Sequence, residues 1–299
     1  MPINDIKKVY LPILITAFSW ASMEVALKLV GSSMDPFQLT FVRFAVGGLL
    51  LLPFAIVEIK KHNLKLKIKD LLYLALLGTL CIPISMVLFQ LGVIHSNAST
   101  AAVILSINPL FSIVFAYFII GEKITKNKII FLMFGFSGIF FIMRPWELQQ
   151  GNSFTGLFLV LAGAMAFSLY TVMGKVSVEK IGIMPQTAIS FLLGAFVLFV
   201  IVIATGKPVF HGIIENFALV FYVSVVVSGI AYYTYFLAIK NSDVATGSYV
   251  FFIKPVLAPV IAVIVLGESI LWNTYVGIAL ILTATYLNIK GKRDENRGH

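Results

Sequence analysis

Residues 91–122 read LGVIHSNASTAAVILSINPLFSIVFAYFIIGE, and residues 237–268 read LAIKNSDVATGSYVFFIKPVLAPVIAVIVLGE. A shift of 146 residues, which is 237 minus 91, aligns the two stretches without a gap and superposes Asn108-Pro109 on Lys254-Pro255. Both stretches also end in Gly-Glu. Apolar sequence seldom repeats polar, proline and Gly-Glu positions in the same order by chance, so the chain contains an internal duplication.

The composition of the whole chain explains what kind of unit is duplicated. Its 299 residues are 60% hydrophobic and 12% charged, whereas soluble domains are about 45–50% apolar and about 25% charged. Apolar runs close to the about 20 residues that span a bilayer recur between polar or Gly/Pro breakers. We predict an all-α integral membrane protein with ten transmembrane helices near residues 9–30, 36–58, 70–94, 97–120, 127–144, 153–175, 185–205, 216–239, 243–266 and 272–289.

Two places in this division into spans allow another interpretation. The first run follows two lysines as a signal peptide would, but it continues to about Val30 without a clear cleavage site, so we predict a retained first span. His95-Ser96-Asn97 is short and only mildly polar, so one long bent helix at 94–97 is an open alternative.

The positions of the basic residues predict the orientation. They lie between apolar runs rather than in one patch, which argues against a nucleic-acid partner despite the net charge of +9. With ten spans and a cytoplasmic N-terminus, nearly all short-loop lysines and arginines fall on the cytoplasmic side, whereas the outer loops keep little beyond Arg144 and Lys207. The positive-inside bias therefore predicts cytoplasmic N- and C-termini in a plasma-membrane protein.

The duplication divides the chain into a first repeat, residues 1–146, and a second, residues 147–299, which form one membrane domain. Five helices per repeat is an odd number, so the second repeat enters the membrane inverted relative to the first. Inverted repeats can exchange conformations and expose a central site to each side in turn, which favours a transporter. A duplicated membrane enzyme is the alternative.

A set of residues spread over both repeats points to a family. They are Trp20, Lys28, Pro36, Arg43, Asn108-Pro109, Gly121-Glu122, Tyr170, Lys175, Lys254-Pro255, Gly267-Glu268 and Gly277. With them the chain resembles the drug/metabolite transporter superfamily, in particular its EamA-type members with two tandem five-helix domains. The resemblance covers essentially the whole chain, and it implies a cavity surrounded by the first, third, fourth, sixth, eighth and ninth helices. Two departures are Phe131 opposite Gly277 and Leu192 opposite Arg43.

Two ionisable residues lie deep in predicted spans, where such groups are rare and usually face a cavity or a partner. Glu24 lies beyond the middle of the first span, and Lys254 is near the middle of the ninth. Neutralisation of Glu24 by Lys28, four residues later, or a purely structural pairing of Glu24 with Lys254, are the simpler interpretations. The functional one is a cavity in which Glu24 binds a substrate ammonium or a proton and Lys254 binds a carboxylate, which suits a zwitterion such as an amino acid.

The remaining candidates fall into three groups. As substrate-binding residues we predict, besides Glu24 and Lys254, Trp20, Gln90, Asn108, Tyr170, Tyr233 and Tyr249. Gln90 and Asn108 could equally serve helix-to-helix hydrogen bonds. As gating or structural charges we predict Lys28, Arg43, Lys175, Glu122 and Glu268, with Glu268 as a possible partner of Arg43. Pro83, Pro109 and Pro255 are predicted helix kinks.

Catalytic motifs are missing from the sequence. It contains no HExxH, GxSxG, CxxC or Walker glycine-lysine loop, and its four histidines are scattered. We therefore predict no enzyme, no metal site and no cofactor, and a secondary transporter of a small polar or amphipathic metabolite that contacts membrane lipid and a small-molecule substrate. Proton coupling and the oligomeric state are open, as are two alternatives: an exporter of organic cations or drugs, and a facilitative small-solute channel.

Overall fold

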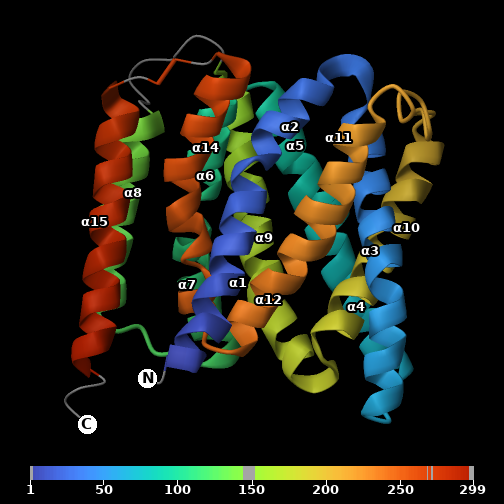
Figure 1. Cartoon of the computed structure of the whole chain (residues 1–299), viewed down its shortest axis with the longest axis horizontal. Helices are drawn as coiled ribbons and strands as arrows, with labels where there is room; N and C mark the ends of the chain where they lie inside the picture. Colours follow the sequence, from blue (N-terminus) through green and yellow to red (C-terminus); the bar gives the residue numbers. More distant parts are fainter. Residues whose placement is uncertain (1–2, 144–151, 268, 271, 296–299) are drawn as a thin grey trace.

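The computed structural model describes residues 3–143, 152–267, 269–270 and 272–295, and within these ranges every regular element is a helix. The helices form an upright bundle in which α1 begins and α15 ends at the same end (Figure 1). We call this the terminal end, and the opposite end the distal end. The elements are α1 Ile3–Ala21, α2 Met23–Val30, η1 Gly31–Ser33, α3 Pro36–Lys61, α4 Ile68–Thr79, η2 Leu80–Met86, α5 Val87–Ile94, α6 Ala98–Leu105, α7 Asn108–Ile120, α8 Lys126–Met143, α9 Phe154–Ile181, α10 Ile183–Ala204, α11 Phe217–Tyr222, η3 Val223–Ile230, α12 Ala231–Lys240, α13 Val244–Gly247, α14 Val250–Leu266 and α15 Trp272–Glu295.

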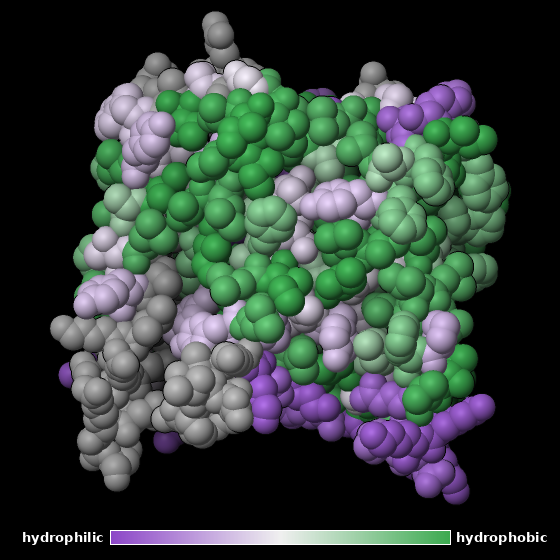
Figure 2. All heavy atoms as spheres, viewed as in Figure 1, coloured by the Kyte–Doolittle hydropathy of each residue, from purple (hydrophilic) through white to green (hydrophobic). Residues whose placement is uncertain are grey.

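Six helical stretches are long and apolar enough to cross a membrane. They are Lys8–Val30, Pro36–Lys61, Ile68–Ile94, Phe154–Ile181, Ile183–Ala204 and Phe217–Lys240. Asn108–Ile120 and Val250–Leu266 are shorter apolar helices, so the number of ten crossings stays a prediction. The side drawn in Figure 2 is hydrophobic over most of its height, as expected of a lipid-facing surface.

Several predicted spans are interrupted. A turn at Ser22 separates α1 from α2, and Ser106 and Ile107 separate α6 from α7, so Pro109 begins a helix rather than kinking one. Pro83 lies in η2, one of two π-helical segments; the other is η3. At 94–97 the chain forms two helices, because α5 ends at Ile94 and α6 begins at Ala98.

The two halves pack through matching helix pairs. Helix α3 packs on α10 and α8 on α15, which pairs the second helix of each half and the fifth of each half. The contact of α5 with α9 has its counterpart in α12 with α1, and that of α7 with α9 in α14 with α1. If each helix is replaced by its counterpart in the other half, this set of contacts is unchanged. Figure 1 also shows that α1 and α9, the first helices of the two halves, run in opposite directions.

The terminal end carries most of the charge. Exposed lysines 60, 61, 65 and 67 surround the connection between α3 and α4. Hydrophilic residues gather at this end of the molecule in Figure 2, around the lower end of α3. At the opposite end the connections after α2 and α10 are poor in lysine.

Candidate functional site

A buried ion pair joins the two halves inside the bundle. Lys254 Nζ on α14 donates a hydrogen bond to Glu24 Oε1 on α2, and the two side chains are 0% and 1% exposed. Burial of both charges removes their hydration, so each depends on the other for compensation. Glu24 Oε2 has no hydrogen-bond partner, which leaves one carboxylate oxygen available to another group.

The turn between α1 and α2 positions Glu24. The Ser22 hydroxyl donates to the carbonyl of Ser19 at 2.9 Å and lies 2.6 Å from the Tyr222 hydroxyl. Such side-chain hydrogen bonds to the backbone compete with the helical pattern. Glu24 therefore lies in the first turn of a new helix, α2, whereas its sequence neighbour Trp20 belongs to α1.

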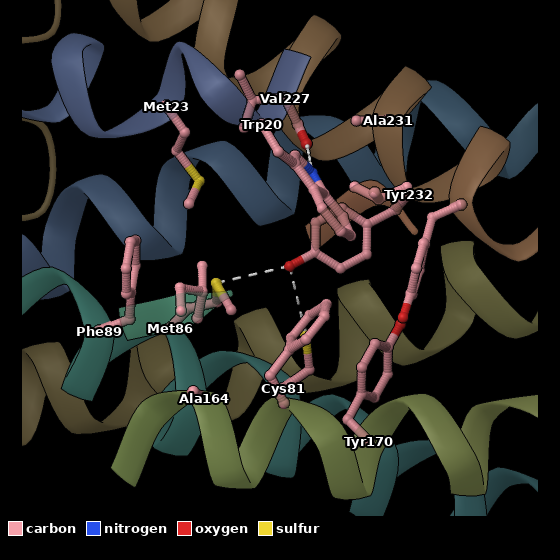
Figure 3. Packing of buried hydrophobic residues seen from close by; sticks show 14 of the residues in the cluster. Trp20, Met23, Cys81, Met86, Phe89, Ala164, Tyr170, Val227, Ala231 and Tyr232 are labelled. Atoms are coloured by element: carbon pink, nitrogen blue, oxygen red, sulfur yellow. Dashed lines mark hydrogen bonds between the residues drawn. The ribbon is translucent and has the colours of Figure 1, made fainter. Parts of the chain in front are cut away.

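Trp20 is the centre of a buried aromatic cluster. Its ring centroid lies 4.9 Å from that of Tyr235, 5.1 Å from that of Tyr232 and 5.6 Å from those of Phe167 and Phe251. Its indole N–H donates to a backbone carbonyl of η3 at 3.2 Å (Figure 3). The cluster thus holds α1 against α9, α12 and α14, and both faces of the indole are occupied by protein in this conformation.

The other three aromatic residues that we predicted to bind substrate differ in position and burial. Tyr170 is fully buried, 6.4 Å by ring centroid from Tyr232, and its hydroxyl lies beside Gln186 and Ser190 of α10. Tyr249 is buried where α14 begins, near the terminal end, and packs on Phe252. Tyr233 is only partly buried, and this helix contributes Tyr232 and Tyr235 to the cluster instead.

The two predicted amides differ in surroundings. Asn108 Nδ2 donates to the Ala164 carbonyl at 3.3 Å, and its Oδ1 accepts from Ser112 at 3.1 Å, so its side chain is committed to packing α7 on α9. Gln90 Oε1 accepts a hydrogen bond from the Thr40 hydroxyl at 2.6 Å. Gln90 also lines a cavity, which keeps it a candidate for contact with a solute.

This cavity opens beside the distal end and has a volume of about 620 Å³. Two of its lining residues, Leu27 and Gln90, follow Glu24 and Phe89 closely in sequence, but Glu24 and Lys254 are not among its lining residues. The expectation that the pair faces an open cavity is therefore not met in this conformation. The cavity is lined by Leu27, Lys28, Gly31, Ser33, Met34, Asp35, Pro36, Gln90, Val93, Ile94, Pro208 and His211.

Lys28 belongs to the wall of this cavity. The pairing of Glu24 with Lys28 along the helix, one of the simpler interpretations of the sequence, is replaced by the contact with Lys254 from the other half. Sequence reasoning missed the contribution of Met34 and His211 to the cavity. His211 follows α10 by several residues, and no periodic pattern indicates that its loop folds back onto η1 and α3.

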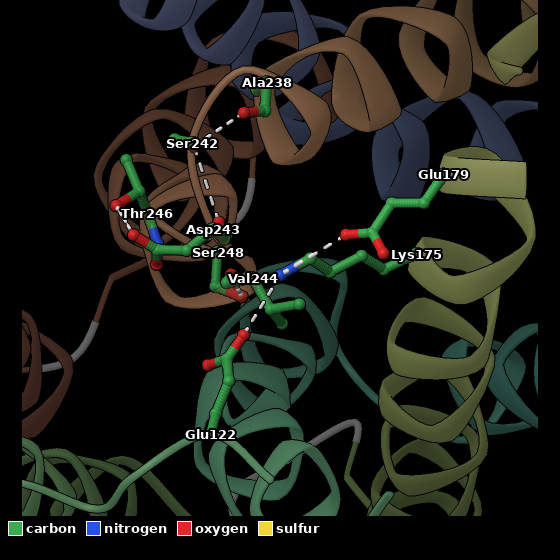
Figure 4. Close-up of polar contacts among 9 residues, drawn as sticks. All are labelled: Glu122, Lys175, Glu179, Ala238, Ser242, Asp243, Val244, Thr246 and Ser248. Atoms are coloured by element: carbon green, nitrogen blue, oxygen red, sulfur yellow. Dashed lines mark hydrogen bonds and ion pairs between the residues drawn. The ribbon is translucent and has the colours of Figure 1, made fainter. Parts of the chain in front are cut away.

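Charged contacts close the terminal end. Lys175 Nζ on α9 lies 3.3 Å from Glu122 Oε1, just after α7, and 4.0 Å from Glu179 Oε1 (Figure 4). Both partners of the first pair are less than one-fifth exposed. This places two of the predicted gating charges, Glu122 and Lys175, in contact across the halves at the side opposite the cavity.

Arg43 on α3 is fully buried and lies near the ion pair. Its Nη1 donates to Met23 Sδ at 3.5 Å, and its guanidinium carbon lies 4.5 Å from the Phe44 ring centroid. Its Nε and Nη2 have no hydrogen-bond partner. Glu268, predicted as its partner, lies outside the described residues, as does the side chain of Pro255.

Comparisons with known proteins agree with this architecture. The EamA-like transporter family matches the chain twice, over residues 7–144 and 154–290. A Clostridium kluyveri protein named "Uncharacterized transporter" is 37% identical over 97% of this chain and 96% of its own. The Escherichia coli "inner membrane transporter YedA" is 26% identical over 91% and 88%. A solved crystal structure aligns with 93% of this chain and 94% of its own, at 18% identity and a TM-score of 0.71, and so shares the fold. The chain is a membrane transporter, not an enzyme, and belongs to the EamA-like transporter family.

Proposed function

We propose that this protein is a secondary transporter that moves a small zwitterion, such as an amino acid, by alternating access. The observation that carries the proposal is the buried Glu24–Lys254 pair, which joins the halves between the cavity and the closed terminal end. A substrate with an ammonium and a carboxylate could replace each side chain's contact with the other. The pair would then separate only when a substrate of the right charges compensates both groups.

The arrangement of the two halves supports alternating access. Their contacts are unchanged when the halves are exchanged, as expected of inverted repeats that rock around a central site. Gly121 and Gly267 end the corresponding helices α7 and α14 with nearly identical left-handed dihedrals, φ 69° and 68°. Ser96 and Ser242 likewise both donate to the carbonyl four residues earlier. The proposed repeats are residues 1–146 and 147–299.

Counterflow is the direct test of this function. Proteoliposomes preloaded with one unlabelled standard amino acid should accumulate the same labelled amino acid transiently, and the initial rate should saturate with concentration. Absence of counterflow for all twenty standard amino acids would exclude the zwitterion proposal. Single-channel currents would instead support a facilitative channel, and competition by organic cations alone would support a drug exporter. Repeating the assay with an imposed pH gradient tests whether protons are the coupling ion.

We further propose that the terminal end is cytoplasmic, since the exposed lysines 60, 61, 65 and 67 gather there, in keeping with the positive-inside bias. In this orientation the cavity faces outward. In a Cys81→Ala background, Ile94→Cys, at an exposed position of the cavity lining, should react with a membrane-impermeant thiol reagent on intact cells. Lys65→Cys, in the connection between α3 and α4, should react only after permeabilisation; the reverse pattern would contradict the orientation.

The same assay tests Glu122 and Lys175 as the inner gate. Lys175→Met removes a cross-half ion pair of the outward-open form, so the inward-open population should rise and Ile94→Cys should react more slowly. Lys180→Met is the matched control, because Lys180 pairs with Asp70 on the exposed surface of the same end and such pairs contribute little. Equal labelling rates in Lys175→Met, in Lys180→Met and in the protein without either change would contradict the assignment of Glu122 and Lys175 as the inner gate.

A further inference from the structure

The buried charges near the centre of the bundle do not balance. Glu24, Arg43 and Lys254 are each 0% exposed, and Glu24 interacts electrostatically with both cations. Arginine stays protonated in proteins, so one carboxylate faces two positive groups. Among the described residues the other electrostatic partners of Arg43 are Tyr232 and Cys81, neither of which is a carboxylate. The centre therefore has an unmet requirement for negative charge.

The unpaired atoms of Arg43 define the shape of the missing group. Nη1 is used by Met23 Sδ, whereas Nε and Nη2 are buried and unpaired. These two nitrogens form one edge of the planar guanidinium, with their N–H bonds parallel. That edge matches the two oxygens of a carboxylate in the bidentate arrangement that makes arginine a preferred oxyanion partner.

The cavity ends close to this edge. Leu27, which lines the cavity, lies one helical turn after Met23, the residue that covers Arg43 Nη1. Gln90, which also lines the cavity, accepts a hydrogen bond from Thr40, which lies three residues before Arg43 on α3. Extending the cavity by about one turn, or about 5 Å, brings a solute to the guanidinium. Met23 is a flexible side chain suited to moving aside.

We propose that Arg43 binds the carboxylate of the transported solute through its Nε–Nη2 edge, which restricts the substrates to carboxylate-bearing compounds. This inference rests on the proposed function and assigns the carboxylate to Arg43 rather than to Lys254 alone. Glu24 Oε2, which is also unpaired, receives the ammonium of an amino acid. Lys254 then holds the Glu24 carboxylate while the site is empty.

Ligand binding to purified protein separates this assignment from a purely structural role. The probes are L-leucine, L-phenylalanine, their methyl esters, which lack the carboxylate, and benzoate, which lacks the ammonium. Dissociation constants come from the shift of thermal unfolding with ligand concentration. Arg43→Gln should raise the dissociation constants of both amino acids by about 10–100-fold, since two charge-assisted hydrogen bonds are lost. The methyl esters should bind both proteins equally weakly.

Two further variants make the result specific. Arg43→Lys keeps the charge but loses the bidentate edge, so its affinity should fall between those of wild type and Arg43→Gln. Ser224→Ala is the control, because the Ser224 hydroxyl is also buried and without a hydrogen-bond partner but lies in η3, outside the residues assigned to the site. Its affinities should equal those of wild type.

Each alternative outcome has a distinct meaning. Wild-type affinity for the amino acids in folded Arg43→Gln, or full retention in Arg43→Lys, would overturn the assignment of the guanidinium edge and leave the transporter proposal intact. Wild-type protein that binds the esters as well as the acids would overturn the restriction to carboxylates. Lack of counterflow for every amino acid would remove the zwitterion function itself, and the role of Arg43 with it.

Discussion

Glu24→Gln and Lys254→Met are each expected to abolish counterflow while the protein remains folded in the membrane. Each removes one member of the only ion pair that the described residues form with both side chains fully buried. The neutral amide cannot compensate a substrate ammonium, and the thioether cannot compensate a carboxylate. Each variant also loses a group that binds the charged ends of the substrate. We therefore expect the initial counterflow rate to fall to background at every substrate concentration.

Loss of stability has to be separated from loss of function. Breaking a buried pair from one side typically costs about 3–5 kcal/mol, whereas replacing both partners by neutral groups is often neutral or stabilising. The double variant Glu24→Gln/Lys254→Met should therefore recover the unfolding temperature that either single variant loses. It should not recover transport. Unfolding temperatures in detergent and initial counterflow rates measure the two quantities independently.

A transporting double variant would contradict the proposal. Counterflow at the wild-type rate would show that the pair only holds α2 against α14. Glu24→Asp is an informative conservative change, because it keeps the charge but withdraws the carboxylate from Lys254 Nζ by one methylene. Partial activity in Glu24→Asp, with none in Glu24→Gln, would assign the requirement to the charge.

Hydropathy predicted where the helices lie because lipid exposure leaves long apolar runs in the sequence. It did not predict the breaks, since a turn at Ser22 or a π-helical segment at Leu80–Met86 changes hydrogen bonding without changing hydropathy. In the same way, Pro109 could be predicted to disturb a helix but not to begin one, because that depends on the hydrogen bonds of Ile107 and Leu110, which reach back only three residues while the dihedrals of Ile107 stay helical.

The charges of the site were predicted more completely than their contacts. Glu24 and Lys254 stood out because ionisable groups are costly at membrane depth, and the structure brings them together. Arg43 is less obvious from sequence: most of α3 is apolar, so its sequence does not show which face is buried against α10 and η3. The cavity was beyond prediction, because residues from three separate segments of the chain line it.

Close helix packing between the halves leads to the second large expected effect. At Gly78 on α4, an added Cβ would lie 2.7 Å from the backbone nitrogen and 3.0 Å from the Cα of Gly194 on α10. A Cβ at Gly194 would in turn lie 2.8 Å from the Cα of Gly78. Small residues let membrane helices approach to this distance, where packing replaces the hydrophobic effect as the source of association.

Gly78→Ala is therefore expected to destabilise the fold at the upper end of, or beyond, the about 1–3 kcal/mol typical of overpacking, because the added methyl meets backbone that cannot move alone. Gly229→Ala is the matched control: it makes the same change in a buried helical glycine, but its closest neighbour is the movable Leu50 side chain, at 3.1 Å. Thermal unfolding in detergent should show a large loss for Gly78→Ala and a small one for Gly229→Ala. Equal unfolding temperatures would mean that α4 and α10 can separate without cost, and the first half would then not be held to the second at this contact.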